Sequence, residues 1–296
     1  MPSSQVRIYA ILARDKPFAA VFRRGPSKNV LLLGWNTLND TFQPGQWLKG
    51  RIYERRCDLS PKGDLLVYYA ANNRAPIYSW SAISRPPFLT ALAMWPKNDA
   101  WGGGGRFVSR TRMELNHHDS ELKLAQGFSV PKWLKVTQFG ERPGRGEDDP
   151  IYSERLKRDG WKLVDFPTET KDDFNAKMWM KFSPPIKWMK PNRKWPRYSL
   201  EMSILGIKEK NGPWYVTEHS LRDDQESRLD NIGRSDWADW SQSGDLLFAR
   251  DGCLYRVPCK AGILARLRDA VEIADFSGMR FQPVKAPPEY LRWPAR

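Results

Sequence analysis

The segment Ala238–Val257 constrains the fold of this 296-residue chain more than any other. Two apolar runs flank Asp251-Gly252, a dipeptide typical of the two-residue hairpin turn in which both central residues have φ > 0. Upstream, Ser243-Gly244-Asp245 predicts a second turn, between strands at Trp237–Trp240 and Leu246–Phe248. Three strands within about twenty residues leave no room for a crossover helix, so the segment predicts an antiparallel meander.

A similar pattern occurs earlier in the chain. Residues 57–68 align without a gap with residues 238–249, so that turn residues match turn residues and apolar residues match apolar ones. Self-similarity of a strand–turn–strand unit in a fixed register indicates an array of repeats. The identical positions of the first unit are Asp58, Ser60, Gly63, Asp64, Leu65 and Leu66, and those of the second are Asp239, Ser241, Gly244, Asp245, Leu246 and Leu247.

The shared pattern, Asp-x-Ser-x-x-Gly-Asp-Leu-Leu, resembles the blade motif of WD40-like β-propellers of the bacterial TolB type. In that motif a turn of the type Ser-Pro-Asp-Gly joins two strands of one blade. This chain instead has Pro61-Lys62-Gly63 and Gln242-Ser243-Gly244 in the turn, and no Trp-Asp pair ends a blade. The resemblance implies a fold and no particular activity, because propellers serve as scaffolds, lids and enzymes alike.

We therefore expect an all-β chain, with residues 1–296 forming a single β-propeller domain of antiparallel four-stranded blades. WD-type blades take about 40–45 residues, and we expect five to seven of them, six being the preferred number. Because an open propeller leaves strand edges unpaired, Val6–Ala13 is expected to pair with C-terminal residues and close the ring.

Local patterns outside the two repeats predict further elements. Ile151–Val164 is expected to form a hairpin around Arg158-Asp159-Gly160. After Cys259, apolar residues at helical spacing predict one short C-terminal helix, with a strand at Val271–Phe276 as the competing interpretation, and Met279–Val284 predicts a final strand.

The composition favours a charged partner and a reducing compartment. The chain has 48 Lys and Arg against 34 Asp and Glu, a formal net charge of +14, which should attract nucleic acid, an acidic protein surface or anionic lipid. Three cysteines are too few for a disulfide framework. The N-terminus lacks the apolar core of a signal peptide, and no apolar run is long enough to span a bilayer. We expect a cytoplasmic protein with no membrane span.

One basic and aromatic segment is the strongest candidate for binding. No acidic residue occurs between Asp173 and Glu201, and four prolines keep much of this segment extended. Alternating cations and exposed rings suit single-stranded nucleic acid, because the cations meet phosphates while the rings stack on bases. Alternatively, the rings pack into the protein body and the cations remain solvated. The candidate binding residues are Lys187, Trp188, Lys190, Arg193, Lys194, Trp195, Arg197 and Tyr198.

Other polar motifs favour structural interpretations. The run Gly102–Gly105 lacks the Lys-Ser/Thr of a phosphate-binding loop, so we expect a flexible turn or a close approach to a bulky neighbour. His117 and His118 are adjacent, which predicts opposite faces of a strand rather than a metal site. Asp58 and Asp239 are expected to bind backbone N–H groups in their own turns.

The loop Gly140–Pro150 is expected to be exposed, and either mobile or partner-binding. No nucleophile, acid–base pair or dinucleotide motif is present, so we expect no catalytic residue and no cofactor. The sequence thus predicts a non-catalytic scaffold that binds a protein partner. A nucleic-acid-binding module using residues 177–198 is the alternative, and a propeller hydrolase with a site assembled from several blades is the third possibility.

Overall fold

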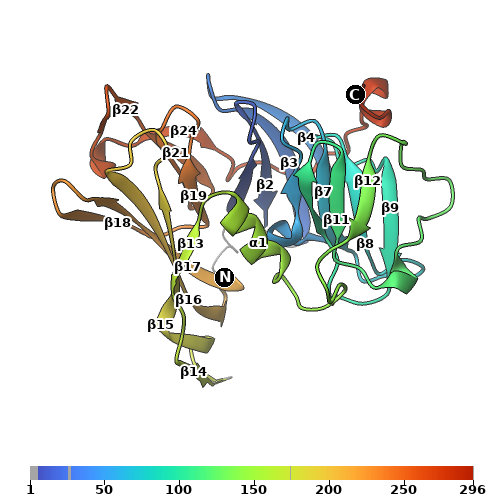
Figure 1. The fold of residues 1–296 in the computed structure, drawn as a ribbon, viewed down its shortest axis with the longest axis horizontal. Helices are drawn as coiled ribbons and strands as arrows, with labels where there is room; N and C mark the ends of the chain where they lie inside the picture. The colour runs from blue at the N-terminus through green and yellow to red at the C-terminus, as the bar shows by residue number, and fades with distance from the viewer. Residues whose placement is uncertain (1–5, 26–27, 174, 296) are drawn as a thin grey trace. The chain divides into compact units, whose positions relative to one another are not determined.

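The computed structural model describes residues 6–25, 28–173 and 175–295 (Figure 1). Within these residues the fold is all-β, as the sequence predicts, and it contains one α-helix. The chain divides into two compact units, which we describe separately: unit 1 comprises residues 1–9 and 156–279, and unit 2 comprises residues 10–155 and 280–296. Among the described residues no helix has the length and apolar character to cross a membrane.

Three sheets build most of unit 2. Sheet A has the order β1-β2-β3-β4, sheet B places β7, β8 and β9 in sequence with β5 and β6 beside β7, and sheet C has the order β10-β11-β12. The bounds are β1 Arg7–Leu12, β2 Phe18–Arg24, β3 Asn29–Asn36, β4 Thr41–Lys49, β5 Arg51–Ile52, β6 Asp58–Leu59, β7 Leu66–Ala71, β8 Ser79–Ser84, β9 Ala93–Lys97, β10 Gly105–Ser109, β11 Arg112–Leu115 and β12 Lys135–Gln138. Strands β11 and β12 pair in parallel, whereas the other strand pairs whose registers are described are antiparallel.

Unit 1 is built from sheets D, E and F. Sheet D has the order β13-β15-β16-β17-β18 with β14 also beside β15, sheet E has the order β19-β20-β21-β24, and sheet F pairs β22 with β23. The bounds are β13 Lys162–Asp165, β14 Glu169–Asp172, β15 Met178–Pro191, β16 Tyr198–Glu209, β17 Tyr215–Asp223, β18 Arg228–Arg234, β19 Trp237–Trp240, β20 Leu246–Arg250, β21 Cys253–Val257, β22 Cys259–Lys260, β23 Ile263–Leu264 and β24 Val271–Asp275. The Asp251-Gly252 hairpin forms as predicted, with φ values of 54° and 83°.

The two repeated segments fold into the same type of turn. In each, the glycine N–H donates to the serine carbonyl, from Gly63 to Ser60 and from Gly244 to Ser241. The Ser60 hydroxyl accepts the N–H of Leu65 at 3.0 Å, and the Ser241 hydroxyl accepts that of Asp245 at 2.9 Å. The strand registers differ by one residue, because Asp58 is opposite Val67 whereas Asp239 is opposite Leu247.

An aromatic ring from the preceding sheet lies against each turn glycine. A Cβ on Gly63 would lie 2.6 Å from the Phe18 ring, and one on Gly244 would lie 2.9 Å from the Trp195 ring. Phe18 belongs to sheet A and Trp195 to the β15–β16 connection, so both rings come from the sheet before the repeat. The two segments therefore share a neighbour of the same kind as well as a turn.

The predicted role of the two repeat aspartates needs correction. The Asp58 carboxylate accepts the N–H of Phe107 at 2.7 Å, and Phe107 lies in β10 of sheet C rather than in the turn of residues 60–64. Asp239 accepts the N–H of Trp240 at 2.7 Å and also binds Lys190 of sheet D. The buried Asp58 and the half-buried Asp239 thus join neighbouring sheets, which turn chemistry alone does not reveal.

The expected hairpin at residues 151–164 is wrong in its first half, because Ile151–Arg158 forms α1, the one α-helix of the described chain. The N–H of Ser153 donates to Asp149 Oδ1 at 3.1 Å, and Pro150 immediately precedes the helix. A capping aspartate followed by proline is a helix-start signal, and it outweighs the turn signal at Asp159-Gly160. The helix therefore lies mid-chain, and the C-terminal helix predicted after Cys259 is replaced by β24, the competing interpretation.

Residues 280–295 form a strap over unit 2 instead of the strand predicted at Met279–Val284. Phe281 contacts Trp47 of sheet A, with ring centroids 6.0 Å apart, and Tyr290 contacts Phe88 at 4.5 Å. Trp293 meets Trp133 edge-to-face at 6.1 Å and packs on the core shared by sheets B and C. Prolines at four positions from 283 to 294 remove ladder donors, which explains why the strap is irregular.

The N-terminal strand β1 pairs with β2, and the last strand, β24, pairs with β21. The N–H of Ile8 also donates to Asp236 Oδ2 at 3.1 Å, which fixes the start of β1 within unit 1. The closed ring of blades, its number of blades and the single-domain boundary over residues 1–296 stay predictions.

We predict that Trp293→Ala lowers the free energy of unfolding by about 2 kcal/mol, because the half-buried indole loses its contacts with Trp133 and the core. Leu291→Ala, in the same strap at a 49% exposed position, should change it by less than about 0.5 kcal/mol. Urea denaturation of the full-length chain measures both changes. Equal stability of the two variants would show that the strap contributes nothing to unit 2.

Candidate protein-interaction surface

The predicted nucleic-acid-binding segment contributes two of its rings to the protein interior. Trp188 is 5% exposed and Tyr198 is 1% exposed. The Tyr198 hydroxyl accepts the N–H of Leu264 at 3.0 Å, which ties sheet D to sheet F. These two rings cannot stack on a ligand while the sheets remain packed, as the alternative interpretation of the segment anticipated.

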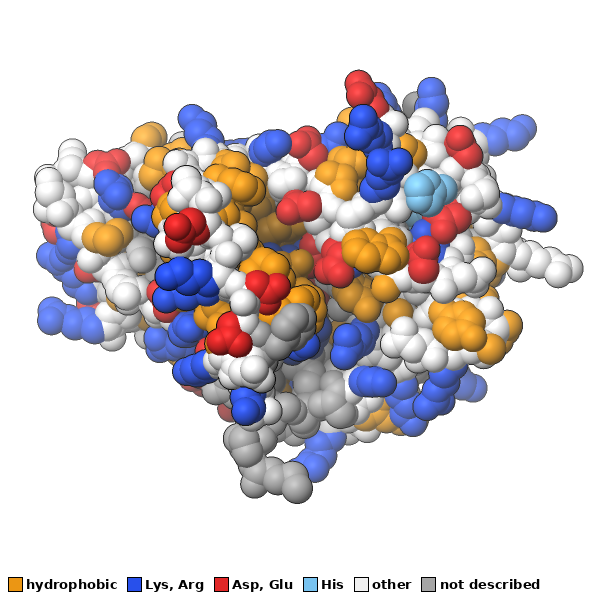
Figure 2. Space-filling model, turned by 90° about the horizontal axis from the view of Figure 1, so that it is seen from below, with side chains coloured by type: hydrophobic (Ala, Val, Ile, Leu, Met, Phe, Trp, Pro, Cys, Tyr) orange, Lys and Arg blue, Asp and Glu red, His pale blue; other side chains and the backbone are white. Residues whose placement is uncertain are grey.

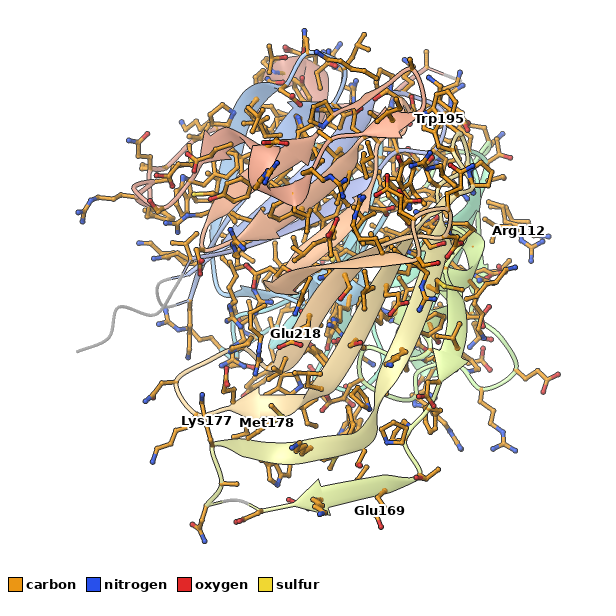
Figure 3. The ribbon with its side chains drawn as sticks, turned by 90° about the vertical axis from the view of Figure 1, so that its left-hand side faces the viewer. Arg112, Glu169, Lys177, Met178, Trp195 and Glu218 are labelled. Atoms are coloured by element: carbon orange, nitrogen blue, oxygen red, sulfur yellow. The ribbon has the colours of Figure 1, made fainter. Side chains whose placement is uncertain are left out.

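The third ring, Trp195, is half-buried in the connection between β15 and β16 (Figure 3). The Asn192 side chain shapes this connection, because its oxygen accepts the N–H groups of Lys194 and Trp195 and its amide donates to Gly244 O. The Trp195 ring then lies against Gly244 and Gly262, where a Cβ on either glycine would come within 2.9 Å. Trp195 therefore packs the β15–β16 connection of sheet D against the turns at Gly244 and Gly262.

Two of the five candidate cations of the segment, Lys190 and Arg197, are engaged in ion pairs. The Lys190 ammonium lies 2.5 Å from Asp239, and Arg197 lies 2.8 Å from Asp223. Burial raises the pKa of Asp239, and the charge of Lys190 opposes that shift. Lys187 is half-buried, and Arg193 and Lys194 are exposed at the loop tip. Nucleic-acid binding by this segment stays a prediction.

The glycine run of unit 2 makes the close approach that the sequence predicts. Gly102, Gly103 and Gly104 all have φ between 59° and 77°, and a Cβ on Gly103 would collide with the Tyr69 ring. Their N–H groups donate to Gly146 O, Asn116 O and Ser81 Oγ, each at 2.7 Å. No N–H of these three glycines remains for a phosphate, so the run is a structural feature.

A buried arginine organises the loop before these glycines. The Arg56 guanidinium is held by Asp148 at 2.9 Å and donates to Ala100 O at 2.6 Å and to Gly102 O at 2.7 Å. It lies 4.7 Å from the Tyr53 ring centroid and 5.1 Å from that of Tyr69. Sequence reasoning missed this residue, because its partners lie 44 to 92 positions away.

The Trp101 side chain is exposed to solvent although buried side chains hold the backbone on either side of it. The carbonyl of Asp99 accepts hydrogen bonds from the hydroxyls of Tyr69 and Ser79. Together with the Arg56 bonds to Ala100 O and Gly102 O, these contacts fix the carbonyls on both sides of Trp101. The Trp101 N–H donates to Asp99 Oδ1 at 3.1 Å, yet its side chain is 60% exposed. We call residues 98–104 the Trp101 loop. Its indole is exposed, and its backbone is fixed by hydrogen bonds to the side chains of Arg56, Tyr69 and Ser79.

The loop of residues 140–149 lies beside the Trp101 loop. The N–H of Gly144 donates to Asn116 Oδ1 at 2.7 Å, and the Asn116 amide donates to Arg145 O at 2.9 Å. With the Gly102–Gly146 bond, these contacts hold the two loops together and leave Arg142 and Arg145 exposed beside Glu141 and Glu147. The loop is exposed, as predicted.

A buried Ser–His pair supports the base of the Trp101 loop. His117 Nδ1 faces Glu121 O at 3.2 Å and must be the N–H donor there, because a carbonyl only accepts. His117 Nε2 therefore accepts the Ser81 hydroxyl at 2.7 Å. Both side chains are fully buried, so a substrate could not reach this pair in the folded protein.

Burial and the nearby charge of Lys97 lower the pKa of His117 to about 4. In the unfolded chain a histidine has a pKa near 6.5, so the unfolded state binds the proton more tightly. The contribution of neutral His117 to the free energy of unfolding is therefore complete above about pH 6.5, and it falls by about 3 kcal/mol as the pH decreases to about 4.

We predict that His117→Gln, which cannot titrate, shows less loss of stability over this pH range than the unmodified chain. Urea denaturation at several pH values measures the difference. Parallel pH profiles for the two proteins would contradict the assignment of this titration to His117.

A second prediction concerns the close approach of Gly103. Gly103→Ala should reduce the free energy of unfolding by about 2 kcal/mol more than Gly127→Ala, because the new methyl group meets the Tyr69 ring. Gly127 is a matched control, since its φ is 84° and no atom would lie within 4 Å of a Cβ there. Equal losses would mean that the backbone conformation, rather than the contact, accounts for the glycine.

No group of three or more His, Cys, Asp or Glu residues in the described part of the chain is placed to hold a metal ion. Comparison with known proteins assigns no family. No family model and no curated protein matches the chain.

Among solved structures, an uncharacterised protein from Listeria monocytogenes EGD-e is 9% identical, with a TM-score of 0.25, over 88% of this chain and 61% of that one. A candidate 6-phosphogluconolactonase from Bacteroides fragilis NCTC 9343 is 9% identical, with a TM-score of 0.31, over 91% of this chain and 95% of that one. Likenesses this weak carry no argument about this chain.

Proposed function

We propose that the protein is a non-catalytic interaction module that binds a protein partner through the surface formed by the Trp101 loop and residues 140–149. The observation that carries the proposal is the exposed Trp101 side chain between carbonyls that buried side chains hold in place. Tryptophan and arginine are the residues most enriched among those that dominate binding energy, and Arg142 and Arg145 are exposed on the adjacent loop.

Rigidity of the loop favours binding. Association costs free energy for every loop and side chain that must be ordered, so a loop already fixed by Arg56, Tyr69 and Ser79 avoids part of that cost. The Trp101 indole supplies a large apolar surface and one N–H donor, the combination that makes tryptophan common at interfaces.

The charge of unit 2 indicates the kind of partner. Residues 10–155 and 280–296 contain 26 Lys and Arg against 15 Asp and Glu, a net charge of +11 out of the chain's +14. Lys and Arg side chains are spread over the face shown in Figure 2. A field of this sign attracts an acidic partner and speeds encounter, and salt screens it. We infer that the partner presents an acidic surface around an apolar pocket for Trp101.

We further propose that the sheets are blades of a TolB-like propeller, supported by the matching turns at Gly63 and Gly244. The three cysteines are unpaired in the structure, which supports a reducing, cytoplasmic location.

The test is affinity capture from an extract of the source cells with the immobilised full-length chain, followed by quantitative mass spectrometry. A partner held by the unmodified chain should be recovered at least about tenfold less well by Trp101→Ala, since such residues contribute about 2 kcal/mol or more. Trp214→Ala, at a 41% exposed tryptophan of unit 1, is the matched control and should retain the partner. Recovery that is equal for Trp101→Ala and the unmodified chain would refute the proposal.

A further inference from the structure

The register of sheet D gathers two tryptophans and a lysine into one row. Met180 is opposite Ile207, which is opposite Tyr215, so Trp179, Lys208 and Trp214 form the next row across the three strands. The Trp179 and Trp214 rings meet edge-to-face, with centroids 6.2 Å apart. The Lys208 ammonium lies 5.0 Å from the Trp179 ring centroid. We call these three residues the Trp179 row.

Four more lysines surround this row. Lys177 and Lys181 lie two positions either side of Trp179 in the chain, and alternate residues of a strand share one face. Lys181 is directly opposite Lys171, and the N–H of Lys210 donates to Lys177 O at 2.8 Å. The four lysines are exposed, and the Lys177 side chain is 85% exposed (Figure 3).

Like charges placed directly opposite each other in a sheet destabilise it, so the lysine pairs are a cost that folding alone does not explain. The nearby carboxylates offset only part of this charge. Glu169 and Asp173 alternate with Lys171 along β14 and its extension, and the Asp173 N–H donates to Trp179 O. Glu209 lies 3.8 Å from Lys177 and 3.7 Å from Arg234. Five lysines therefore lie beside the three carboxylates Glu169, Asp173 and Glu209, next to an indole that is 41% exposed at Trp214.

We propose that this end of sheet D binds single-stranded nucleic acid, with bases stacked on Trp214 and Trp179 and phosphates bound by the surrounding lysines. Stacking on aromatic side chains combined with backbone-tracking cations is how single strands are held without sequence preference. Duplex bases are already stacked, so they could not use the indoles. An acidic peptide would meet the lysines but would leave the exposed Trp214 face without a matching partner.

This site uses none of the residues proposed for protein binding. Trp179 and Trp214 belong to unit 1, whereas Trp101 belongs to unit 2. Lys177, Trp179 and Lys181 lie within the basic segment of residues 177–198, but the site uses none of the eight candidate binding residues from Lys187 to Tyr198. Of those eight, Arg193 and Lys194 are exposed at the β15–β16 loop tip, away from the Trp179 row in the register of sheet D.

The experiment measures fluorescence anisotropy of fluorescein-labelled 20-nucleotide oligo-dT and oligo-U with the full-length chain over a series of salt concentrations. Trp214→Ala should raise Kd about tenfold, since stacking on one aromatic ring is worth about that factor. The double variant Lys177→Glu/Lys210→Glu, at two exposed positions, should weaken binding and reduce the slope of log K against log salt by about 1.4. Circular dichroism checks that both variants fold.

Two controls separate this proposal from its alternatives. Trp101→Ala should bind the oligonucleotides as the unmodified chain does, which keeps failure of this site distinct from failure of the protein-binding surface. Arg193→Glu/Lys194→Glu should have little effect. Loss of binding in that variant together with normal binding by Trp214→Ala would overturn the proposal in favour of the β15–β16 loop.

Two further outcomes would overturn it. A duplex of the same length that binds as tightly as oligo-dT, with Trp214→Ala unaffected, would show that charge alone is at work. Poly-glutamate that competes with oligo-dT equally well in the unmodified chain and in Trp214→Ala would identify an acidic protein segment as the ligand.

Discussion

The guanidinium of Arg56 lies over the adjacent rings of Tyr53 and Tyr69 and donates to one carboxylate and two carbonyls. A charge taken out of water is stable only when its hydrogen-bonding capacity is met, and here it is met by groups from two other segments, residues 100–102 and Asp148. The arginine therefore specifies where those segments meet. The position of the Trp101 indole, the contact of the glycine run with Tyr69 and the placement of residues 140–149 all depend on that specification.

Buried polar groups join the sheets elsewhere in the chain as well. Asp58 reaches from sheet B to β10, and Lys190 reaches from β15 to Asp239. Networks of this kind add geometric specificity that apolar packing lacks, because each donor and acceptor has few acceptable positions. In a protein made of similar sheets, such contacts determine which sheet packs on which.

The sequence-based predictions that the structure confirms depend on residues that are close together in the chain. The Asp251-Gly252 turn, the extended basic segment and the close approach at Gly102–Gly105 depend on short-range backbone preferences. The predictions that failed needed long-range information. Asp58 binds Phe107, 49 positions away, and the strap of residues 280–295 follows from aromatic contacts across more than 150 positions.

The two candidate binding surfaces also differ in how far the sequence could predict them. Nothing in the sequence near Trp101 marks it as exposed, because its exposure follows from the partners of Arg56. The Trp179 row was accessible in principle, since the Lys210-Asn211-Gly212 turn sets the register that brings Lys208 beside Trp214. What the sequence could not indicate was that Trp188 and Tyr198, only a few residues further along, would be buried.

The rings that abut Gly63 and Gly244 have a consequence for how this chain can diverge. Phe18 and Trp195 occupy space that a single methyl group on the facing glycine would take away. Both glycines also have a positive φ, which strains any other residue, so Gly63 and Gly244 should persist among descendants of this sequence and limit the size of the facing rings. Trp195 packs against two glycines, Gly244 and Gly262, so we expect it to be substituted more slowly than Phe18.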